Sequence, residues 1–94
     1  MNKFTIRVEL TNASYDEYML LHDEMEKRGF RRYIVSDDGT KYDLPDAEYD
    51  FRGSQEGADV LALAKSAAGE TGCKFRILVT QAHSRTWSGL DKIG

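Results

Sequence analysis

The side chains best suited to catalysis lie near the C-terminus, in the segment HSRTW at residues 83–87. His83 can carry a proton near neutral pH, and Arg85 can hold a phosphate or stabilise an oxyanion. RNA cleavage without a metal needs a base for the 2′-hydroxyl, an acid for the leaving oxygen and a cation for the phosphorane. We therefore predict His83 and Arg85 as candidate catalytic residues. The more ordinary interpretation is a tail in which Trp87 packs back on the core and His83 is exposed.

A second group of side chains could hold nucleic acid. A basic surface with an aromatic residue can bind single-stranded RNA, since cations contact the phosphates and the ring stacks on a base. Whether such residues share one surface depends on the strands that carry them. The predicted RNA-binding residues are Arg7, Arg31, Arg32, Tyr33, Lys74 and Arg76.

Residues 29–49 (GFRRYIVSDDGTKYDLPDAEY) contain five acids, which raises the question of a metal site. An EF-hand loop does not fit, because counting back from its glycine places an isoleucine at the first ligand position. A divalent-metal site drawn from Asp37, Asp38 and Asp43 is one interpretation, and a turn with solvated acids is the simpler one. The single cysteine excludes a cysteine-based zinc site, and two histidines leave little for another. We predict no bound metal.

Other nucleophiles and cofactor motifs are missing from the sequence. Cys73 lies on the inward phase of a predicted strand, which is typical of a small core residue rather than a nucleophile. No G-x-S-x-G elbow occurs, and the glycines lie at turns and helix ends instead of forming a phosphate-binding loop. We predict no cofactor, and a small-molecule-binding domain has no pocket motif in its favour.

The first third of the chain predicts a strand followed by a helix. Apolar residues alternate with polar ones over residues 4–10, which is the period of a half-buried strand. Ser14 and Glu17 have the spacing of a capping box, so a helix should run from Tyr15 to about Arg28.

A hairpin should come next. Residues 30–35 (FRRYIV) are rich in β-branched and aromatic side chains and predict a second strand. The Asp-Gly pair at residues 38–39 predicts the turn. Residues 41–44 predict a third strand, antiparallel to the second. Pro45 interrupts it, because proline has no N–H to donate to a neighbouring strand. Residues 47–51 continue the same strand after the interruption.

The remaining chain predicts a helix, a strand and a tail. Ser54 is expected to cap the second helix, with residues 55–56 in its first turn. The last strand covers residues 73–80 (CKFRILVT), in which apolar and polar side chains alternate again. Residues from about 81 to 94 show no period and predict an irregular tail.

The predicted order is strand, helix, strand, strand, helix, strand. Two β-α-β halves that meet at a central hairpin make the ferredoxin-like βαββαβ split sandwich, an α+β fold. Right-handed crossovers place four antiparallel strands in the spatial order 4-1-3-2, with both helices on one face of the sheet. Residues 1–94 should form this fold as a single domain.

The other face of the predicted sheet is open to solvent. If the apolar residues of the first strand face the helices, Arg7 points to the open face, and Lys74 and Arg76 join it from the neighbouring last strand. Arg31 and Tyr33 join it from the second strand if Ile34 points inward. An acid at position 9 lies on the same face and weakens the case for RNA.

Composition restricts the classes of function. A net charge of −3 argues against a protein whose whole surface attracts nucleic acid, although it allows a local basic face. No apolar run approaches the roughly 18 residues of a membrane span, so no membrane contact is predicted. The N-terminus alternates apolar and polar residues, unlike a signal peptide, and small secreted domains usually carry paired cysteines. We therefore predict a cytoplasmic protein.

The order of elements and the pattern GF.R.I...DG..Y.LP.AEY resemble the GhoS-like family of small ferredoxin-like proteins. The segments FTIRVEL at residues 4–10 and RTW at residues 85–87 add to the resemblance. It spans nearly the whole chain by layout, while its motif consists mostly of turn and strand residues. The matching residues are Gly29, Phe30, Arg32, Ile34, Asp38, Gly39, Tyr42, Leu44, Pro45, Ala47, Glu48 and Tyr49.

The resemblance implies an antitoxin of a type V toxin–antitoxin system. The named member of that family is an endoribonuclease that cleaves the messenger RNA of a small membrane toxin. Through its fold the resemblance extends to small CRISPR-associated nucleases that dimerise through this sheet. It assigns no catalytic residue here, because the matching stretch contains no agreed nucleophile or base.

The leading hypothesis is a GhoS-like antitoxin that binds single-stranded RNA or cleaves messenger RNA without an obligatory metal. The alternative is a non-catalytic interaction module whose open sheet face pairs with itself or with another protein. A homodimer is also expected, because two-fold dimers are the commonest oligomers and Tyr33 and Leu78 lie among charges on that face. RNA binding predicts an affinity that falls steeply with salt, whereas an interaction module predicts little salt dependence.

Overall fold

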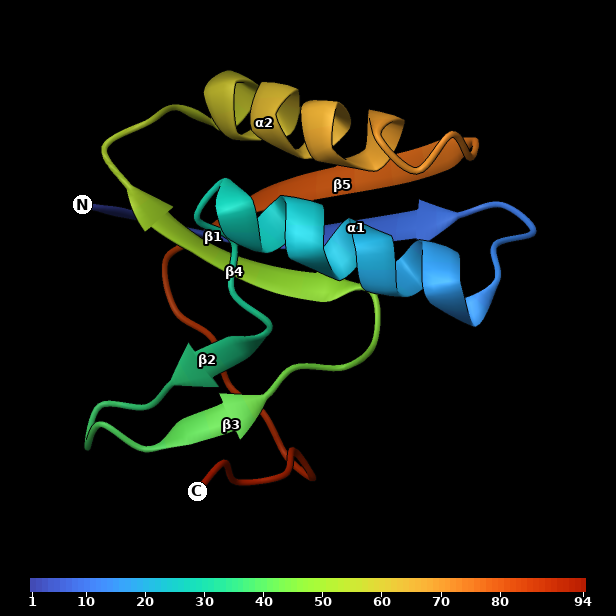
Figure 1. Cartoon of the computed structure of the whole chain (residues 1–94). Helices are drawn as coiled ribbons and strands as arrows, with labels where there is room; N and C mark the ends of the chain where they lie inside the picture. The colour runs from blue at the N-terminus through green and yellow to red at the C-terminus, as the bar shows by residue number, and fades with distance from the viewer.

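The computed structural model of the chain describes all 94 residues and contains two helices and five strands. The predicted α+β class is confirmed, with two helices and antiparallel sheets. In chain order the elements are β1 (Asn2–Leu10), α1 (Tyr15–Lys27), β2 (Tyr33–Val35), β3 (Lys41–Asp43), β4 (Glu48–Gly53), α2 (Gly57–Gly69) and β5 (Phe75–Ala82) (Figure 1).

The main sheet holds three antiparallel strands in the order β4-β1-β5. In its middle strand, Ile6 lies opposite Tyr49 of β4 and Val79 of β5. Every second residue of β1 from Phe4 to Leu10 is buried, as the alternating pattern predicts. Both helices pack on the face to which these side chains point (Figure 1).

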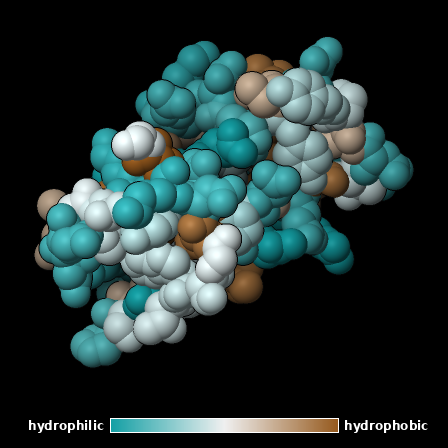
Figure 2. Space-filling model, turned by 90° about the horizontal axis from the view of Figure 1, so that it is seen from below, coloured by the Kyte–Doolittle hydropathy of each residue, from teal (hydrophilic) through white to brown (hydrophobic).

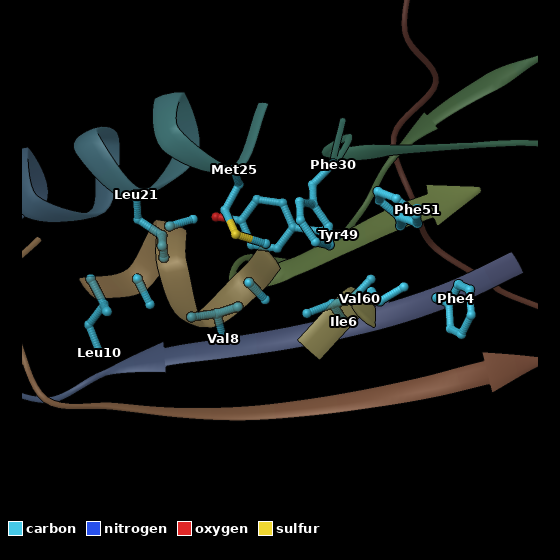
Figure 3. Close-up of a cluster of buried hydrophobic side chains, with 13 residues drawn as sticks. Phe4, Ile6, Val8, Leu10, Leu21, Met25, Phe30, Tyr49, Phe51 and Val60 are labelled. Carbon is cyan, nitrogen blue, oxygen red and sulfur yellow. The ribbon is translucent and has the colours of Figure 1, made fainter. Parts of the chain in front are cut away.

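The core is a cluster of 13 buried side chains between this face and the helices. Leu21 and Met25 reach into it from α1, and Val60 reaches into it from α2 (Figure 3). Phe30 and Phe51 extend the cluster toward the end of β4, with ring centroids 4.9 Å apart. The core therefore fixes β1 and β4 against both helices and leaves the opposite face of the sheet outside it.

The predicted single four-stranded sheet is wrong. The strands β2 and β3 form a separate two-stranded sheet, which is joined to β4 by one bridge between Arg31 and Asp50. Pro45 explains part of the difference, because the third strand breaks there into β3 and β4, as its missing N–H predicts. Ala47 adds to it with a φ of 71°, a conformation that turns the chain before β4 begins.

The first helix agrees with its prediction at both ends. Ser14 Oγ accepts a hydrogen bond from the Glu17 N–H at 3.2 Å, and Glu17 Oε1 accepts one from the Ser14 N–H at 2.8 Å. This reciprocal pair is the predicted capping box. The helix ends at Lys27, and Gly29 then takes a φ of 92°.

The predicted cap of the second helix is wrong. The helix begins at Gly57, three residues after Ser54, and its N-cap residue is Glu56. The N–H of Glu56 donates to Asp59 Oδ2 at 3.2 Å, and that carboxylate also lies at the positive end of the helix dipole. With 13 residues each, neither α1 nor α2 has the length and apolar character that crossing a membrane requires.

Cys73 lies at the edge of the core rather than within it. Its side chain is half-buried and packs against the core cluster just before β5 begins. Sγ lies 2.9 Å from Glu17 Oε2. This hydrogen bond to a carboxylate, together with burial, raises the pKa of the Cys73 thiol. The protonated thiol is a poor nucleophile, in line with the structural role predicted for it.

The tail after β5 returns to the hairpin. Lys92 forms an isolated bridge with Tyr42, the Asp43 N–H donates to the Asp91 carbonyl at 2.8 Å, and the Trp87 ring lies 5.5 Å from the Tyr42 ring. Trp87 thus packs on the hairpin instead of the main core. The segment between β5 and these contacts crosses the gap between the two sheets (Figure 1).

Asp38 holds the turn between β2 and β3. Ser36 Oγ donates to its Oδ1, and the Thr40 N–H donates to the same oxygen at 3.0 Å. Gly39 has a φ of 85°, as the predicted Asp-Gly turn requires. The hydrogen bonds from Ser36 and Thr40 lower the pKa of Asp38 from 3.8 to about 2.

The depressed pKa predicts a pH-dependent hairpin. Because the fold favours the carboxylate, its stabilising contribution is complete above pH 3.8 and is lost as the pH falls through about 2. We expect the Thr40 amide proton resonance to titrate with a midpoint near 2, and Asp38→Asn to abolish this titration. Asp37→Asn is the control and should leave it unchanged. A midpoint near 3.8 would show that the turn does not hold the carboxylate.

Candidate functional site

A groove of about 370 Å³ lies where the tail crosses from the main sheet to the hairpin. We call it the basic groove. Residues from four segments line it, namely the start of β1, the strand β2 with its turn, the end of β4, and the end of β5 with the tail that follows it. The lining residues are Lys3, Ile34, Val35, Ser36, Asp37, Arg52, Ala82, His83, Ser84, Arg85 and Trp87.

Both predicted catalytic residues are in this groove. His83 is exposed and makes no hydrogen bond with the rest of the protein, so its imidazole is free to contact a ligand. Arg85 is held in place instead, since its Nη1 lies 2.8 Å from Asp50 Oδ1 and donates to Thr5 Oγ1 at 3.3 Å. The structure therefore combines one free imidazole with one fixed guanidinium.

Asp50 is the residue that organises the floor of this region. It is completely buried, although its neighbours Tyr49 and Phe51 point to the helices and it points the opposite way. The hairpin and the tail cover it there. Its backbone pairs with that of Arg31 through two hydrogen bonds of 2.7 and 2.8 Å, which bring the hairpin against β4.

Three arginines surround the buried carboxylate of Asp50. Arg31 donates to Oδ2 through Nη2 at 2.5 Å and through Nε at 3.2 Å, and Arg52 Nε lies 3.7 Å from the same oxygen. Arg85 lies beside Oδ1 without the alignment of a hydrogen bond, so the attraction there is purely ionic. A carboxylate without water is costly unless it is paired in this way.

The pairing also acts on the arginine. Burial alone lowers the pKa of Arg31, but the hydrogen bond and the attraction of Asp50 outweigh it and raise that pKa. Arg31 additionally lies over the ring of Tyr33, with 4.8 Å between the guanidinium carbon and the ring centroid. Of the predicted RNA-binding residues, Arg31 therefore serves the junction between hairpin and sheet, and Tyr33 packs against its guanidinium.

Cations outnumber acids around the basic groove. Lys3, Arg52 and Arg85 line it, against one lining acid, Asp37, and the buried Asp50 behind it. Lys3 and Arg52 are exposed and lie opposite each other in the register of β1 and β4. The sequence did not predict this pair, because the two residues lie far apart along the chain. The alternation of β1 does place Lys3 on the same face as Arg7.

The other predicted basic residues lie at the opposite end of the same sheet face. Arg7 is 3.0 Å from Glu9 and 3.3 Å from Glu48, and Arg76 is 2.8 Å from Glu9. Two cations and two acids thus form one exposed, neutral network. The hydrogen bonds from Arg7 and Arg76, and then their charges, lower the pKa of Glu9, so this acid stays ionised.

Two predicted residues lie outside both groups. Lys74 is exposed just before β5. Arg32 lies on the helix side of the hairpin, 3.8 Å from Asp46. Figure 2 views the side on which the hairpin and the tail lie, and hydrophilic residues dominate it with apolar ones scattered between them.

The acids of residues 29–49 do not gather into a metal site. Asp38 is engaged in its turn, Asp37 faces the basic groove and Asp43 is exposed on β3. Nowhere in the chain do three or more His, Cys, Asp or Glu side chains lie together in an arrangement that could hold a metal ion.

We compared the sequence with protein-family models and with curated proteins. No family model matches the chain, and no curated protein matches its sequence.

Proposed function

We propose that this chain is a cytoplasmic, GhoS-like antitoxin that binds single-stranded RNA in the basic groove and cleaves it there without an obligatory metal. The observation that carries the proposal is the convergence of Lys3, Arg52, Arg85 and the free imidazole of His83 on one groove. The assignment to the GhoS-like family is based on two features. One is the resemblance in residues 29–49, and the other is the position of β1 between β4 and β5, which is the position of the first strand in a ferredoxin-like sheet.

The groove has the parts that RNA binding needs. Lys3 and Arg52 face each other across two strands and can contact a phosphate from both sides. The half-buried ring of Trp87 lines the same groove and offers a surface on which a base can stack. Lys3 forms no ion pair, and Arg52 Nε lies 3.7 Å from Asp50, whereas Arg7 and Arg76 lie closer to a carboxylate, at 3.0 and 2.8 Å from Glu9, which competes with phosphate for them.

Cleavage follows from the same arrangement. His83 takes the proton of the 2′-hydroxyl, the 2′-oxygen forms a bond to phosphorus and the bond to the 5′-oxygen breaks, with a proton from water completing the leaving hydroxyl. The products are a 2′,3′-cyclic phosphate and a free 5′-hydroxyl. Arg85 stabilises the added negative charge of the phosphorane, and Asp50 and Thr5 hold its guanidinium in place.

The test compares two double variants that remove the same charge. Lys3→Ala/Arg52→Ala removes two of the three cations that line the groove, and Arg7→Ala/Arg76→Ala removes both cations of the neutral network. Each phosphate contact on a single strand contributes about 0.7 to the slope of log affinity against log salt. We therefore expect the first variant to lower that slope by about 1.4 for a fluorescent single-stranded RNA, and the second to leave it unchanged.

The possible outcomes separate the hypotheses. A loss confined to Arg7→Ala/Arg76→Ala would place RNA on the open face and refute the groove. Unchanged binding in both variants would refute a phosphate-directed interaction.

A second candidate is the interaction module, and Leu78 favours it. This side chain is 64% exposed on the open face of β5, opposite Arg7 of β1. An exposed leucine on a sheet face suits contact with a second copy of the chain. Apolar contact depends little on salt, so a self-association that persists unchanged through the salt series, without RNA binding, would favour this candidate.

A further inference from the structure

A second pocket lies on the helix side of the molecule and shares no residue with the basic groove. Its volume is about 350 Å³, and we call it the helix pocket. One wall comes from α1 and the other from Arg32 and the bend before β4. The lining residues are Tyr15, Tyr18, Met19, His22, Arg32, Asp46 and Ala47.

The deep side of the helix pocket is rigid. The Tyr18 hydroxyl accepts a hydrogen bond from the Leu10 N–H at 3.0 Å and donates one to the Leu10 carbonyl at 3.3 Å. His22 Nδ1 lies 2.6 Å from the hydroxyl of Tyr49, a completely buried residue. These bonds fix both rings before any ligand arrives, which reduces the entropy that binding costs.

The buried hydroxyl favours one tautomer of His22. The Tyr49 hydroxyl has no hydrogen-bond partner other than Nδ1, and its proton is assigned there because a buried O–H group needs an acceptor. The ring proton of a neutral imidazole then resides on Nε2, which has no partner in the protein. Burial, and then the charge of Arg32, lower the pKa of His22, which agrees with a neutral ring. His22 therefore offers an N–H donor without a charge.

Arg32 supplies a charged donor to the same pocket. Its only acidic partner is Asp46 at 3.8 Å, and the side chain of Asp46 is fully exposed. An ion pair this long and this exposed holds its partners weakly. A ligand carboxylate can therefore take the place of Asp46 on the guanidinium, and the Arg geometry suits a bidentate contact.

The rest of the lining is apolar and unusually exposed. Tyr15 is 77% exposed and Met19 39% exposed, although both are large side chains. Ala47 closes the pocket from the bend, in a left-handed conformation that costs free energy in a residue with a Cβ. Its carbonyl accepts a hydrogen bond from the Val8 N–H at 2.8 Å, which holds it there. Strained backbone of this kind is often found at binding sites.

From these features we infer that the helix pocket binds a small aromatic carboxylate. The carboxylate contacts Arg32 and the N–H of His22, and the ring lies against Tyr15 and Met19. The volume is at the lower end of the range for small-molecule pockets, which suits a ligand of one ring or two. A cationic ligand of the same shape is disfavoured, because Arg32 and His22 both present donors to it and the one lining acid, Asp46, is fully exposed to solvent.

Phenylacetate is the probe, and phenethylamine is its cationic counterpart. We expect phenylacetate, titrated to about 10 mM because ligands of this size bind in the millimolar range, to shift the amide resonances of residues 15–22 and 46–47 in a ¹⁵N–¹H spectrum. Phenethylamine should leave them in place. Arg32→Gln should weaken the binding about tenfold, since it removes a charged hydrogen bond, whereas Arg52→Gln, a matched change in the basic groove, should not affect it.

Equal shifts with phenethylamine, or undiminished binding in Arg32→Gln, would overturn the inference, and so would the absence of any shift. Because Arg32 is exposed, its replacement leaves the fold intact and a negative result stays interpretable. The inference does not rest on RNA binding, so either proposal can fail without the other.

Discussion

Replacing Asp50 by alanine is expected to lower the free energy of unfolding by about 3 kcal/mol. The reason is that Arg31, Arg52 and Arg85 then lose the buried carboxylate they share, and breaking a buried ion pair costs about 3–5 kcal/mol. The lower value applies because the arginines remain partly exposed. In a domain of this size the change corresponds to a fall in Tm of roughly 12–24 °C, measurable by circular dichroism.

Asp43→Ala is the matched control for this effect. Asp43 is exposed on β3 and forms no ion pair, so its replacement should change the free energy of unfolding by less than about 0.5 kcal/mol. Asp50→Asn keeps the shape of the side chain while removing its charge, and it should fall between the other two. A loss below about 1 kcal/mol in Asp50→Ala would mean that the three arginines do not depend on this carboxylate.

The second large effect concerns cleavage. His83→Ala should lower the rate of RNA cleavage about 100-fold, because a positioned proton carrier typically contributes 10²-fold or more. The affinity for RNA should persist, since the change leaves Lys3, Arg52 and Arg85, the proposed phosphate contacts, in place. The measurement is a single-turnover assay on end-labelled RNA, with the 2′,3′-cyclic phosphate as the diagnostic product.

Ser84→Ala provides the control, because it changes the next residue of the same groove without removing the imidazole. It should cleave RNA at the rate of the unchanged protein. Undiminished cleavage in His83→Ala would leave His83 as an exposed residue of the tail. Binding without any cleavage by the unchanged protein would refute the enzymatic part of the proposal and keep the RNA-binding part.

Much of the fold was predictable because its signals are local. The capping box of Ser14 and Glu17 joins residues three positions apart, and the turn of Asp38 joins residues two positions apart. The burial of alternate residues in β1 follows from the geometry of a strand and needs no knowledge of its neighbours. The wrong prediction of Ser54 as the N-cap of α2 also has a local cause. Asp59 accepts a hydrogen bond from the N–H of Glu56, so the helix is capped two residues later.

The candidate site was predictable only in part. His83 and Arg85 stand out by residue type, and the structure places both in one groove. Lys3 and Arg52 did not stand out, because 49 positions separate them and only the register of β1 and β4 makes them neighbours. In the same way, Arg7 was predicted to contact RNA, and the acid at position 9 was recognised on the same face, but its second acidic partner, Glu48, lies 41 positions away.

By itself, then, the sequence determined the helices, the hairpin turn, the break at Pro45 and the inward face of β1, because short-range hydrogen bonds and side-chain periodicity specify them. Only the tertiary structure decided that the hairpin forms a second sheet, that the tail returns to it and that Asp50 is buried beneath both. The physical reason is the separation of the interacting residues along the chain. The ion pair between Asp50 and Arg85 and the hydrogen bond between Arg85 and Thr5, 80 positions apart, exist only once distant segments have packed together.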